Sequence, residues 1–427
     1  MNLKIYEKEV MYRINSKYKS QRSIGEYIRK ERLSQGLKQE LVCKGICSVS
    51  YYSRIESNKV SPSRLYINKI LGKLNKAVPS NLNNDSNQNN KELVNNLLTA
   101  MEYKNNKIVD EVYIKIKHNQ DINQELYEFI YSIYYMKISH IPPLINSLHQ
   151  QQIHFDNEEL LLYLENLGTY YALTNKYNDA EKCLKMSIKL QNHSGLSKPS
   201  ILYRYAWVLG KMNNDYQCID YAKEADKIYT MNNNIYRSLQ CKMLIAIKMS
   251  KWFPDKAINM YKKILLLTEH GDFKQTFRMS KFNLSLLLKK CNYLKEAEKA
   301  FVELLNLYPN DISLKFNIYL EYIDLLYVLS RYEEAIKYYN KLKLLNIDTE
   351  KYLFFIKYYD YRLQNKIITS ALLDYENVFI PYIIKEKNPT LELKLRKEYA
   401  LLLESNKEYR KAIFEYKKII ELSGENI

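Results

Sequence analysis

Hydrophobic positions along the chain recur with the spacing of helices. Between residues 23 and 79, apolar side chains repeat every three or four positions in short runs, which predicts four short helices. From residue 92 to residue 427 the runs are longer and follow one another in pairs. The stretch Ser80–Lys91, SNLNNDSNQNNK, has almost nothing to bury and is predicted to be a linker. The pattern therefore predicts an all-α chain with a small domain at 23–79, a linker at 80–91 and a long helical domain at 92–427.

The third helix of the small domain has the clearest limits. Ser48 is a favourable N-cap because its side-chain oxygen can accept from backbone amides of the first turn, and the helix extends through Glu56. Tyr52 and Ile55 are expected to face the core. In the preceding short helix, Leu41 and Val42 are expected to point inward.

The succession of short helices resembles the helix-turn-helix of the lambda-repressor or XRE family. The resemblance is carried by Gly25, Ile28, Arg29, Arg32, Gly36, Leu37, Gln39, Leu41, the run from Gly45 to Glu56, and Pro62. One departure is Asn58, where the family usually has Gly. Asn also tolerates the left-handed backbone conformation, so this departure costs little.

The resemblance implies that the third helix enters the major groove of DNA. The residues that would read base edges are Ser48, Val49, Ser50 and Tyr51. Those that would hold phosphates are Gln39, Arg54, Asn58 and Lys59. A plainer alternative stays open, in which Tyr51 is merely exposed and Arg54 pairs with Glu56 or a neighbour.

Charge supports a nucleic-acid partner for the small domain. The chain has 65 Lys and Arg against 48 Asp and Glu, a net charge of +17. Residues 1–80 contain 17 Lys and Arg and 6 Asp and Glu, a net charge of +11. Most of the excess positive charge therefore lies in less than a fifth of the chain. A codon bias towards Lys would act along the whole chain and does not explain this asymmetry.

A basic extension, residues 1–22, precedes the small domain. Two interpretations are open from the sequence: a basic arm, or the result of a start codon upstream of the true one, since Met11 is an alternative start.

The long domain contains a repeat. Small residues recur at intervals of 36 to 41 positions, each at the expected start of the second helix of a pair: Ala180, Cys218, Ala257, Ala297, Ala335, Ala371 and Ala412. The unit with Gly168, Tyr171 and Ala180 resembles the tetratricopeptide repeat. With four degenerate helices before it, about nine pairs are expected, stacked as a right-handed α-solenoid. The unit around Ala371 matches least well.

The same resemblance implies a concave groove lined by the first helix of each pair, with a role in peptide binding and dimerisation for residues 92–427. Amides there could grip the main chain of a peptide and aromatic rings could form pockets. The candidate residues are Asn166, Tyr203, Trp207, Lys242, Phe282, Asn283, Asn317, Asp324 and Tyr327. Each of them could equally be an ordinary helix residue.

Composition and the lack of certain motifs argue against several other folds and functions. Nine Gly and nine Pro are too few for most sandwiches, barrels or doubly wound folds, and no glycine-rich phosphate loop is present. Cys43 and Cys47 have the spacing of two metal ligands on a helix, but no His or second Cys pair is near, which favours core packing. We therefore expect no enzyme, no cofactor and no metal. No apolar run is long enough for a membrane span and no secretory signal is seen, which predicts a cytoplasmic protein.

A helix-turn-helix joined to a tetratricopeptide array resembles the RRNPP group of peptide-responsive regulators, which includes the Rgg, PlcR and PrgX types. The resemblance implies a homodimeric transcription regulator that binds a double-stranded DNA operator and a short signalling peptide. The alternative is an adaptor whose solenoid binds a protein partner, with DNA binding secondary.

Overall fold

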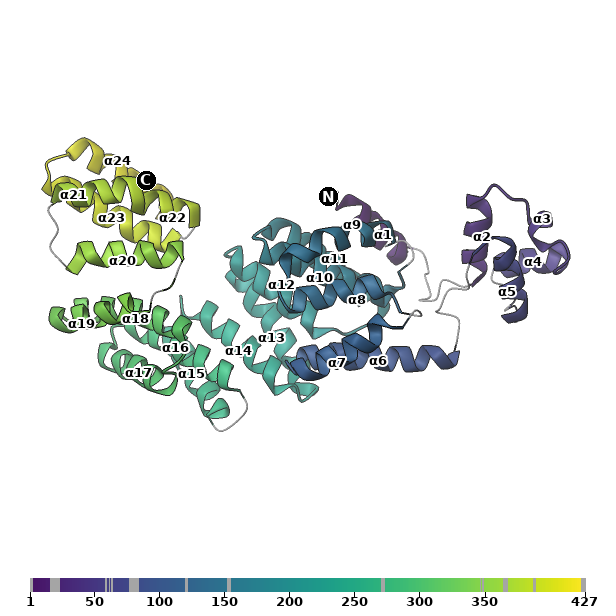
Figure 1. The fold of residues 1–427 in the computed structure, drawn as a ribbon, viewed down its shortest axis with the longest axis horizontal. Helices are drawn as coiled ribbons and strands as arrows, with labels where there is room; N and C mark the ends of the chain where they lie inside the picture. The colour runs from purple at the N-terminus through teal and green to yellow at the C-terminus, as the bar shows by residue number, and fades with distance from the viewer. Residues whose placement is uncertain are drawn as a thin grey trace. The chain divides into compact units, whose positions relative to one another are not determined.

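The computed structural model describes residues 3–15, 24–57, 60, 62, 64–76, 84–119, 122–151, 155–269, 273–345, 347, 349–363, 368–386 and 389–423. These residues form helices and the turns between them, with no strand, so the all-α prediction is confirmed. The chain divides into two compact units, Met1–Leu267 and Thr268–Ile427 (Figure 1). No helix of the described residues is long and apolar enough to cross a membrane.

The small domain of the first unit consists of α2 (Ile24–Ser34), α3 (Gln39–Cys43), α4 (Val49–Glu56) and α5 (Arg64–Lys73). Its core is formed by Ile28, Val42, Cys43, Tyr52, Ile55, Ile67, Ile70, Leu71 and Leu74. The expected inward positions are therefore confirmed for Val42, Tyr52 and Ile55. The prediction that Leu41 points inward was wrong. Leu41 is 58% exposed, because only Val42 and Cys43 of the five-residue helix α3 face the core.

The repeat helices stack in consecutive pairs. Those of the first unit are α6 (Asn84–Glu102), α7 (Asn106–Lys117), α8 (Gln124–Tyr134), α9 (Ile141–Gln151), α10 (Asn157–Leu173), α11 (Tyr177–Ser194), α12 (Pro199–Lys211), α13 (Asp215–Met231), α14 (Ile235–Met249) and α15 (Pro254–Thr268). A short 3-10 turn, η2 (Ile138–His140), precedes α9. Helix α6 begins at Asn84, inside the stretch 80–91 that the sequence predicted to be a linker.

The second unit continues the pairs. Its helices are α16 (Lys274–Lys290), α17 (Leu294–Leu307), α18 (Ile312–Val328), α19 (Tyr332–Lys343), α20 (Glu350–Leu363), α21 (Ile368–Asp374), η4 (Tyr375–Phe379), α22 (Ile380–Glu386), α23 (Pro389–Ser405) and α24 (Tyr409–Ser423). If α21, η4 and α22 are taken as one second helix, the described residues from α6 onward form nine pairs, as expected.

Small residues allow the paired helices to approach closely. All seven repeat anchors, from Ala180 to Ala412, are buried in second helices. Gly168 of α10 is the clearest case, because a Cβ atom built there would lie 2.8 Å from Cγ of Leu184 in α11. The pattern that predicted the repeat is thus a packing requirement between the two helices of each pair.

The turns inside the pairs explain why the array needs so little glycine. Several have a residue in the left-handed conformation, and Asn often fills this place: Asn175, Asn213 and Asn292 have φ between 60° and 64°. Asn233, in the turn between one pair and the next, has φ of 55°. Asn tolerates this conformation better than most side chains. The low glycine content is therefore compatible with many tight turns.

The unit around Ala371 departs from the others at Pro381. Between α21 and α22 the helix widens into the π-helical turn η4, in which the backbone amide of Ile380 donates to the carbonyl of Tyr375. Proline has no amide hydrogen and crowds the preceding turn, and a wider turn accommodates it. This irregularity accounts for the weak match of that repeat in the sequence.

The N-terminal extension contains a helix, α1 (Lys4–Asn15), that packs in the repeat array. Tyr6 and Val10 belong to the same hydrophobic core as helices α6 to α14, and α1 contacts α11 (Figure 1). Neither sequence interpretation of residues 1–22 anticipated this position. Residues 16–22 lie outside the described part of the chain.

Candidate DNA-binding and peptide-binding surfaces

The first turn of α4 presents its side chains to solvent. The Ser48 hydroxyl accepts from the backbone amide of Tyr51 at 3.2 Å, so Ser48 is the N-cap of this helix. Val49 is 42% exposed and Ser50 is also exposed. Tyr51 is half-buried, with its ring centre 5.6 Å from that of Tyr66. The four predicted base-reading residues therefore lie together at one end of α4.

Buried ionic contacts fix α4 against the two helices before it. Arg32 of α2 donates from Nε and Nη2 to the two carboxylate oxygens of Glu56, at 2.6 and 2.9 Å. The Gln39 side-chain amide of α3 donates to Glu56 at 2.6 Å. Burial opposes ionisation of Glu56, but hydrogen bonds from Arg32 and Gln39 outweigh it and hold the pKa of this carboxyl below its usual range.

This network shows that Gln39 has a partner inside the protein and that Arg54 is not the partner of Glu56. Gln39, predicted to hold a phosphate, has its amide directed at Glu56. Arg54 is exposed, and the partner of Glu56 is Arg32 instead. Asn58 and Lys59 lie outside the described residues. Sequence reasoning quoted Arg32 and Glu56 in the motif but did not pair them, although their types and their places in the first and third helices were a usable signal.

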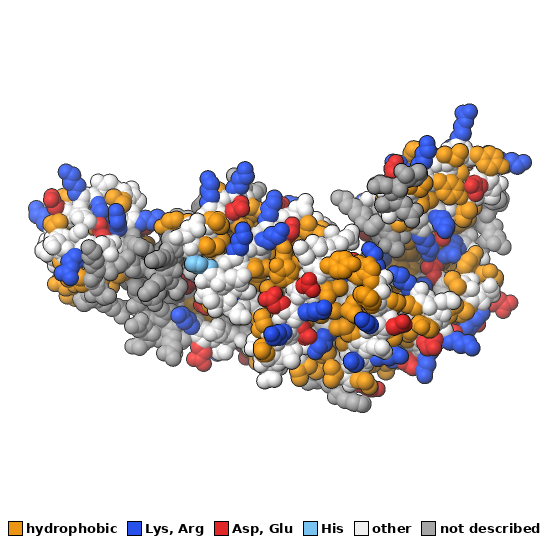
Figure 2. Space-filling view, turned by 180° about the vertical axis from the view of Figure 1, so that it is seen from behind, with side chains coloured by type: hydrophobic (Ala, Val, Ile, Leu, Met, Phe, Trp, Pro, Cys, Tyr) orange, Lys and Arg blue, Asp and Glu red, His pale blue; other side chains and the backbone are white. Residues whose placement is uncertain are grey.

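Charge on the repeat array is mixed rather than concentrated. On the face seen in Figure 2, Lys and Arg side chains are interspersed with Asp and Glu side chains. This distribution agrees with the near balance of charge beyond residue 80.

In the first unit, the predicted groove residues are largely engaged with the protein. Asn166 is buried and its amide donates to the carbonyl of Leu162 at 2.8 Å. Burial raises the pKa of Tyr203 to about 12. Trp207 is half-buried with Lys211 Nζ 5.4 Å from its ring centre, and Lys242 donates to Ser238 at 2.9 Å.

The sequence analysis missed a cluster of charged residues in this unit. Its members lie in α6, α10, α12 and α14, each of which is the first helix of its pair. Glu165 of α10 is 3% exposed and pairs with Nε of Arg204 in α12 at 2.9 Å. Arg237 of α14 donates from Nη1 to Gln240 at 2.8 Å, and its buried Nε has no hydrogen-bond partner among the residues that the structure describes. Burial raises the pKa of Glu102 at the end of α6, and the charge of Arg237 opposes that shift.

A repeated dipeptide could have revealed these arginines. Tyr203-Arg204 and Tyr236-Arg237 occupy the first helices α12 and α14, and Tyr361-Arg362 occurs in α20 of the second unit. Of these tyrosines, only Tyr203 was predicted to line a pocket, and none of the three arginines was singled out.

In the second unit, Asp324 of α18 is the centre of an ionic network. Its carboxylate accepts from Arg362 Nη1 and Lys394 Nζ, both at 2.8 Å, and from the Tyr359 hydroxyl at 3.2 Å. Burial opposes ionisation, but Lys394 and then Lys289 outweigh it and hold the pKa of Asp324 below its usual range. Asp324 thus positions two cations rather than facing solvent alone.

The other four predicted groove residues of this unit, Phe282, Asn283, Asn317 and Tyr327, have different surroundings. The guanidinium of Arg362 lies 4.2 Å from the ring centre of Tyr327. Asn317 donates to the carbonyl of Ser313 at 2.9 Å. Phe282 packs edge-on to Phe301, and Asn283 is half-buried.

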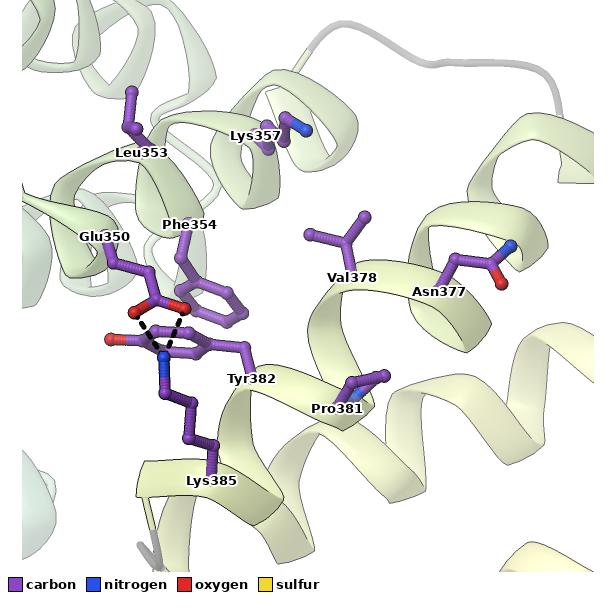
Figure 3. Close-up of a pocket in the computed structure, with 9 residues that line it drawn as sticks. All are labelled: Glu350, Leu353, Phe354, Lys357, Asn377, Val378, Pro381, Tyr382 and Lys385. Carbon is purple, nitrogen blue, oxygen red and sulfur yellow. Dashed lines mark hydrogen bonds and ion pairs between the residues drawn. The ribbon is translucent and has the colours of Figure 1, made fainter.

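A cavity of about 330 Å³ lies beside the irregular helix α21–η4–α22 (Figure 3). Tyr382 stacks on Phe354 of α20 at 4.4 Å between ring centres, and Lys385 donates to both carboxylate oxygens of Glu350. None of the predicted groove residues lines it. Pro381 and Val378 of the irregular segment are among its lining residues.

Two family models match the chain. A helix-turn-helix model matches residues 28–79 and a tetratricopeptide repeat model matches residues 280–311. Both matches fall where the sequence predicted these elements. The first covers the whole of α3, α4 and α5, and the second covers α17 with parts of α16 and the following turn.

Known proteins resemble the chain over most of its length. The transcriptional activator NprA of Geobacillus stearothermophilus is 26% identical over 337 residues, which is 74% of this chain and 80% of NprA. The apo form of the quorum sensor NprR from B. thuringiensis has a TM-score of 0.68 at 19% identity, covering 79% of this chain and 99% of NprR. NprR in complex with its cognate peptide NprX has a TM-score of 0.58 at 17% identity, and the match covers 78% of this chain and 98% of NprR.

Proposed function

We propose that this chain is an RRNPP-type transcriptional regulator, a cytoplasmic protein that binds an operator through α4 and a short signalling peptide through its repeat array. It has the architecture of that group, a helix-turn-helix followed by tetratricopeptide repeats. NprA is a transcriptional activator and NprR a quorum sensor crystallised with a peptide, which supports both parts of the proposal.

The observation that carries the DNA-binding part is the contrast between the two sides of α4. Tyr52, Ile55 and Glu56 fix one side in the small domain, while Val49 and Ser50 at the N-terminal end of the helix face solvent. A recognition helix needs this combination, since base contacts require side chains held in a fixed register. A homodimer would place two such helices about 34 Å apart on the operator.

For the peptide, the charged clusters of the array supply suitable chemistry. Arg204 and Arg237 in the first unit, and Arg362 with Lys394 in the second, present cations beside carboxylates and aromatic rings. Such groups can pair with the termini and side chains of a peptide. The peptide regulates DNA binding only if it favours one form of the array, by about 1 to 3 kcal/mol for typical coupling.

The DNA-binding part is tested by selecting duplexes from a random library with the full-length protein and measuring their affinity. Val49→Ala and Ser50→Ala should each weaken the selected duplex by about 1 to 3 kcal/mol, since each loses a base contact. Lys69→Ala, an exposed change on α5, serves as the control. If the selection yields no preferred sequence, or if both alanine variants bind like the control, α4 does not read DNA.

The peptide-binding part is tested by mass spectrometry of the protein purified from its host and then denatured. We expect a released peptide of roughly five to ten residues, the length that an extended peptide groove accommodates. Release of a co-purified protein partner in place of a short peptide, together with intact capture of that partner by the Val49→Ala variant, would favour the adaptor alternative.

A further inference from the structure

Helix α1 is joined to the repeat array by a buried tyrosine. Tyr6 is fully buried, and its hydroxyl is hydrogen-bonded to Nδ1 of His149 in α9 and, at 2.9 Å, to the hydroxyl of Tyr163 in α10. The ring packs at 5.2 Å from the His149 ring and at 5.6 Å from the Tyr163 ring, centre to centre. Val10, one turn further on, is 1% exposed. These contacts span more than 140 positions of sequence.

A buried arginine near the C-terminal end of α1 also bonds to the repeat array. Arg13 is fully buried, and it donates to the Phe155 carbonyl at 2.8 Å and to the side-chain oxygen of Asn157 at 3.1 Å. Its Nε donates to Glu9 of the same helix at 2.8 Å. Burying a guanidinium is costly unless its donors are satisfied, and here a carboxylate, an amide oxygen and a carbonyl satisfy them. Such a site accepts arginine specifically, because lysine lacks the planar fork.

The position of α1 changes the connectivity of the small domain. Before α2 the chain lies in the array at α9, α10 and α11, and after α5 it re-enters the array at α6. Residues 16–23 can span at most about 30 Å and residues 77–83 about 25 Å, at roughly 3.5 Å per residue. The small domain is thus an insertion between two segments of the array rather than a head on one linker.

We propose that α1 is a second tether, which holds the small domain to the array at both ends and limits the positions that the domain can take. The two attachment points lie on different repeats, α6 on the first and α9 to α11 on the second and third. A change in curvature across these repeats moves the two points relative to each other. In the regulator proposed above, this movement would reach the small domain through both chain segments, a consequence that rests on the proposed function.

The docking of α1 is tested by cutting the first tether. A recognition sequence for a site-specific protease is inserted between Ser20 and Gln21 of the full-length protein, and the cut product is passed over a size-exclusion column. The N-terminal fragment should co-elute with the rest of the chain. The double variant Tyr6→Ala, Arg13→Ala should release it, whereas Lys8→Ala, exposed on the same helix, should not. Release of the wild-type fragment overturns the proposal.

The restriction of the small domain is tested by distance distributions between two spin labels, one at Lys69 in α5 and one at Lys223 in α13, both exposed. Non-cysteine labels are used because the chain has six cysteines. The double variant, and the cut double variant still more, should broaden the distribution at least twofold relative to Lys8→Ala. Equal widths overturn the proposal. Circular dichroism confirms that the variants keep their helices, and neither measurement requires DNA or peptide, so the tether and the proposed function can fail independently.

Discussion

Helices α1 and α4 each carry an arginine, and the two arginines have opposite environments. Arg13 of α1 is fully buried and bonded to the array, whereas Arg54 of α4 is exposed at the surface of the small domain. Both count equally in the charge excess of residues 1–80. The difference shows that a local excess of Lys and Arg does not say which cations are available to a nucleic acid.

The two helices also differ in how they are held. Helix α4 is fixed by a carboxylate of its own, Glu56, that receives hydrogen bonds from Arg32 and Gln39 of neighbouring helices. In helix α1 the charged group is the cation Arg13, which donates to two neutral acceptors of the array, the Asn157 side-chain oxygen and the Phe155 carbonyl. Helix α4 thus contributes a buried anion to its contacts, whereas α1 contributes a buried cation, and this difference can be tested by substitution.

The largest effect is expected from removing the cation that holds α4. Arg32→Ala leaves Glu56 buried with its main partner gone, which should lower the free energy of unfolding of the small domain by about 3 to 5 kcal/mol. Hydrogen exchange of α2 to α5 amides in the full-length protein measures it. Arg29→Ala, exposed on the same helix, is the matched control and should stay within about 0.5 kcal/mol. Equal effects of the two substitutions would mean that the ion pair does not hold α4.

A smaller, graded effect is expected from pH. The folded-state pKa of Glu56 lies below its unfolded value, so the stabilisation it gives is present above the ordinary glutamate pKa and is lost as pH falls through the folded-state value. Protection factors of the small-domain amides, which correct for the pH dependence of intrinsic exchange, should therefore fall in acid. Glu56→Gln removes this titration and should flatten that part of the profile. A profile of the same shape in both proteins would exclude Glu56 as its source.

The smallest effect on stability, within about 0.5 kcal/mol, is expected for Arg54→Ala because the side chain is exposed. On the selected duplex it should reduce the slope of log affinity against log salt by about one, the signature of one lost phosphate contact. Arg13→Ala should leave that slope unchanged. A reduced slope for Arg13→Ala would identify α1 as a DNA-contacting arm and erase the contrast between the two helices.

Sequence patterns anticipated the parts of the site that local rules control. Ser48 was identified as the N-cap because capping chemistry depends on neighbours in sequence. Val49 and Ser50 were named as base-reading residues from the resemblance, and their side chains are exposed. The repeat anchors were found because the same packing problem recurs at each pair. Leu41 was misplaced because a five-residue helix has too few positions for its period to define a face.

Contacts distant in sequence could not be read in this way. The pairing of Asp324 with Lys394 joins residues 70 positions apart, and nothing near either one specifies the other. The same holds for Glu165 with Arg204, although the repeated Tyr-Arg pairs were a signal.

The residues alone indicated an all-α protein with paired helices, because helical period, capping residues and the recurring small residue are local properties of the chain. The helix-turn-helix and the tetratricopeptide array were implied by resemblance to known families. The folded protein was needed to show that the basic N-terminal segment contributes a helix to the array, with Tyr6 and Arg13 buried against α9 and α10. The physical reason is that the same short polar helix suits solvent, DNA or a protein surface. Which one it meets depends on acceptors more than 140 residues away.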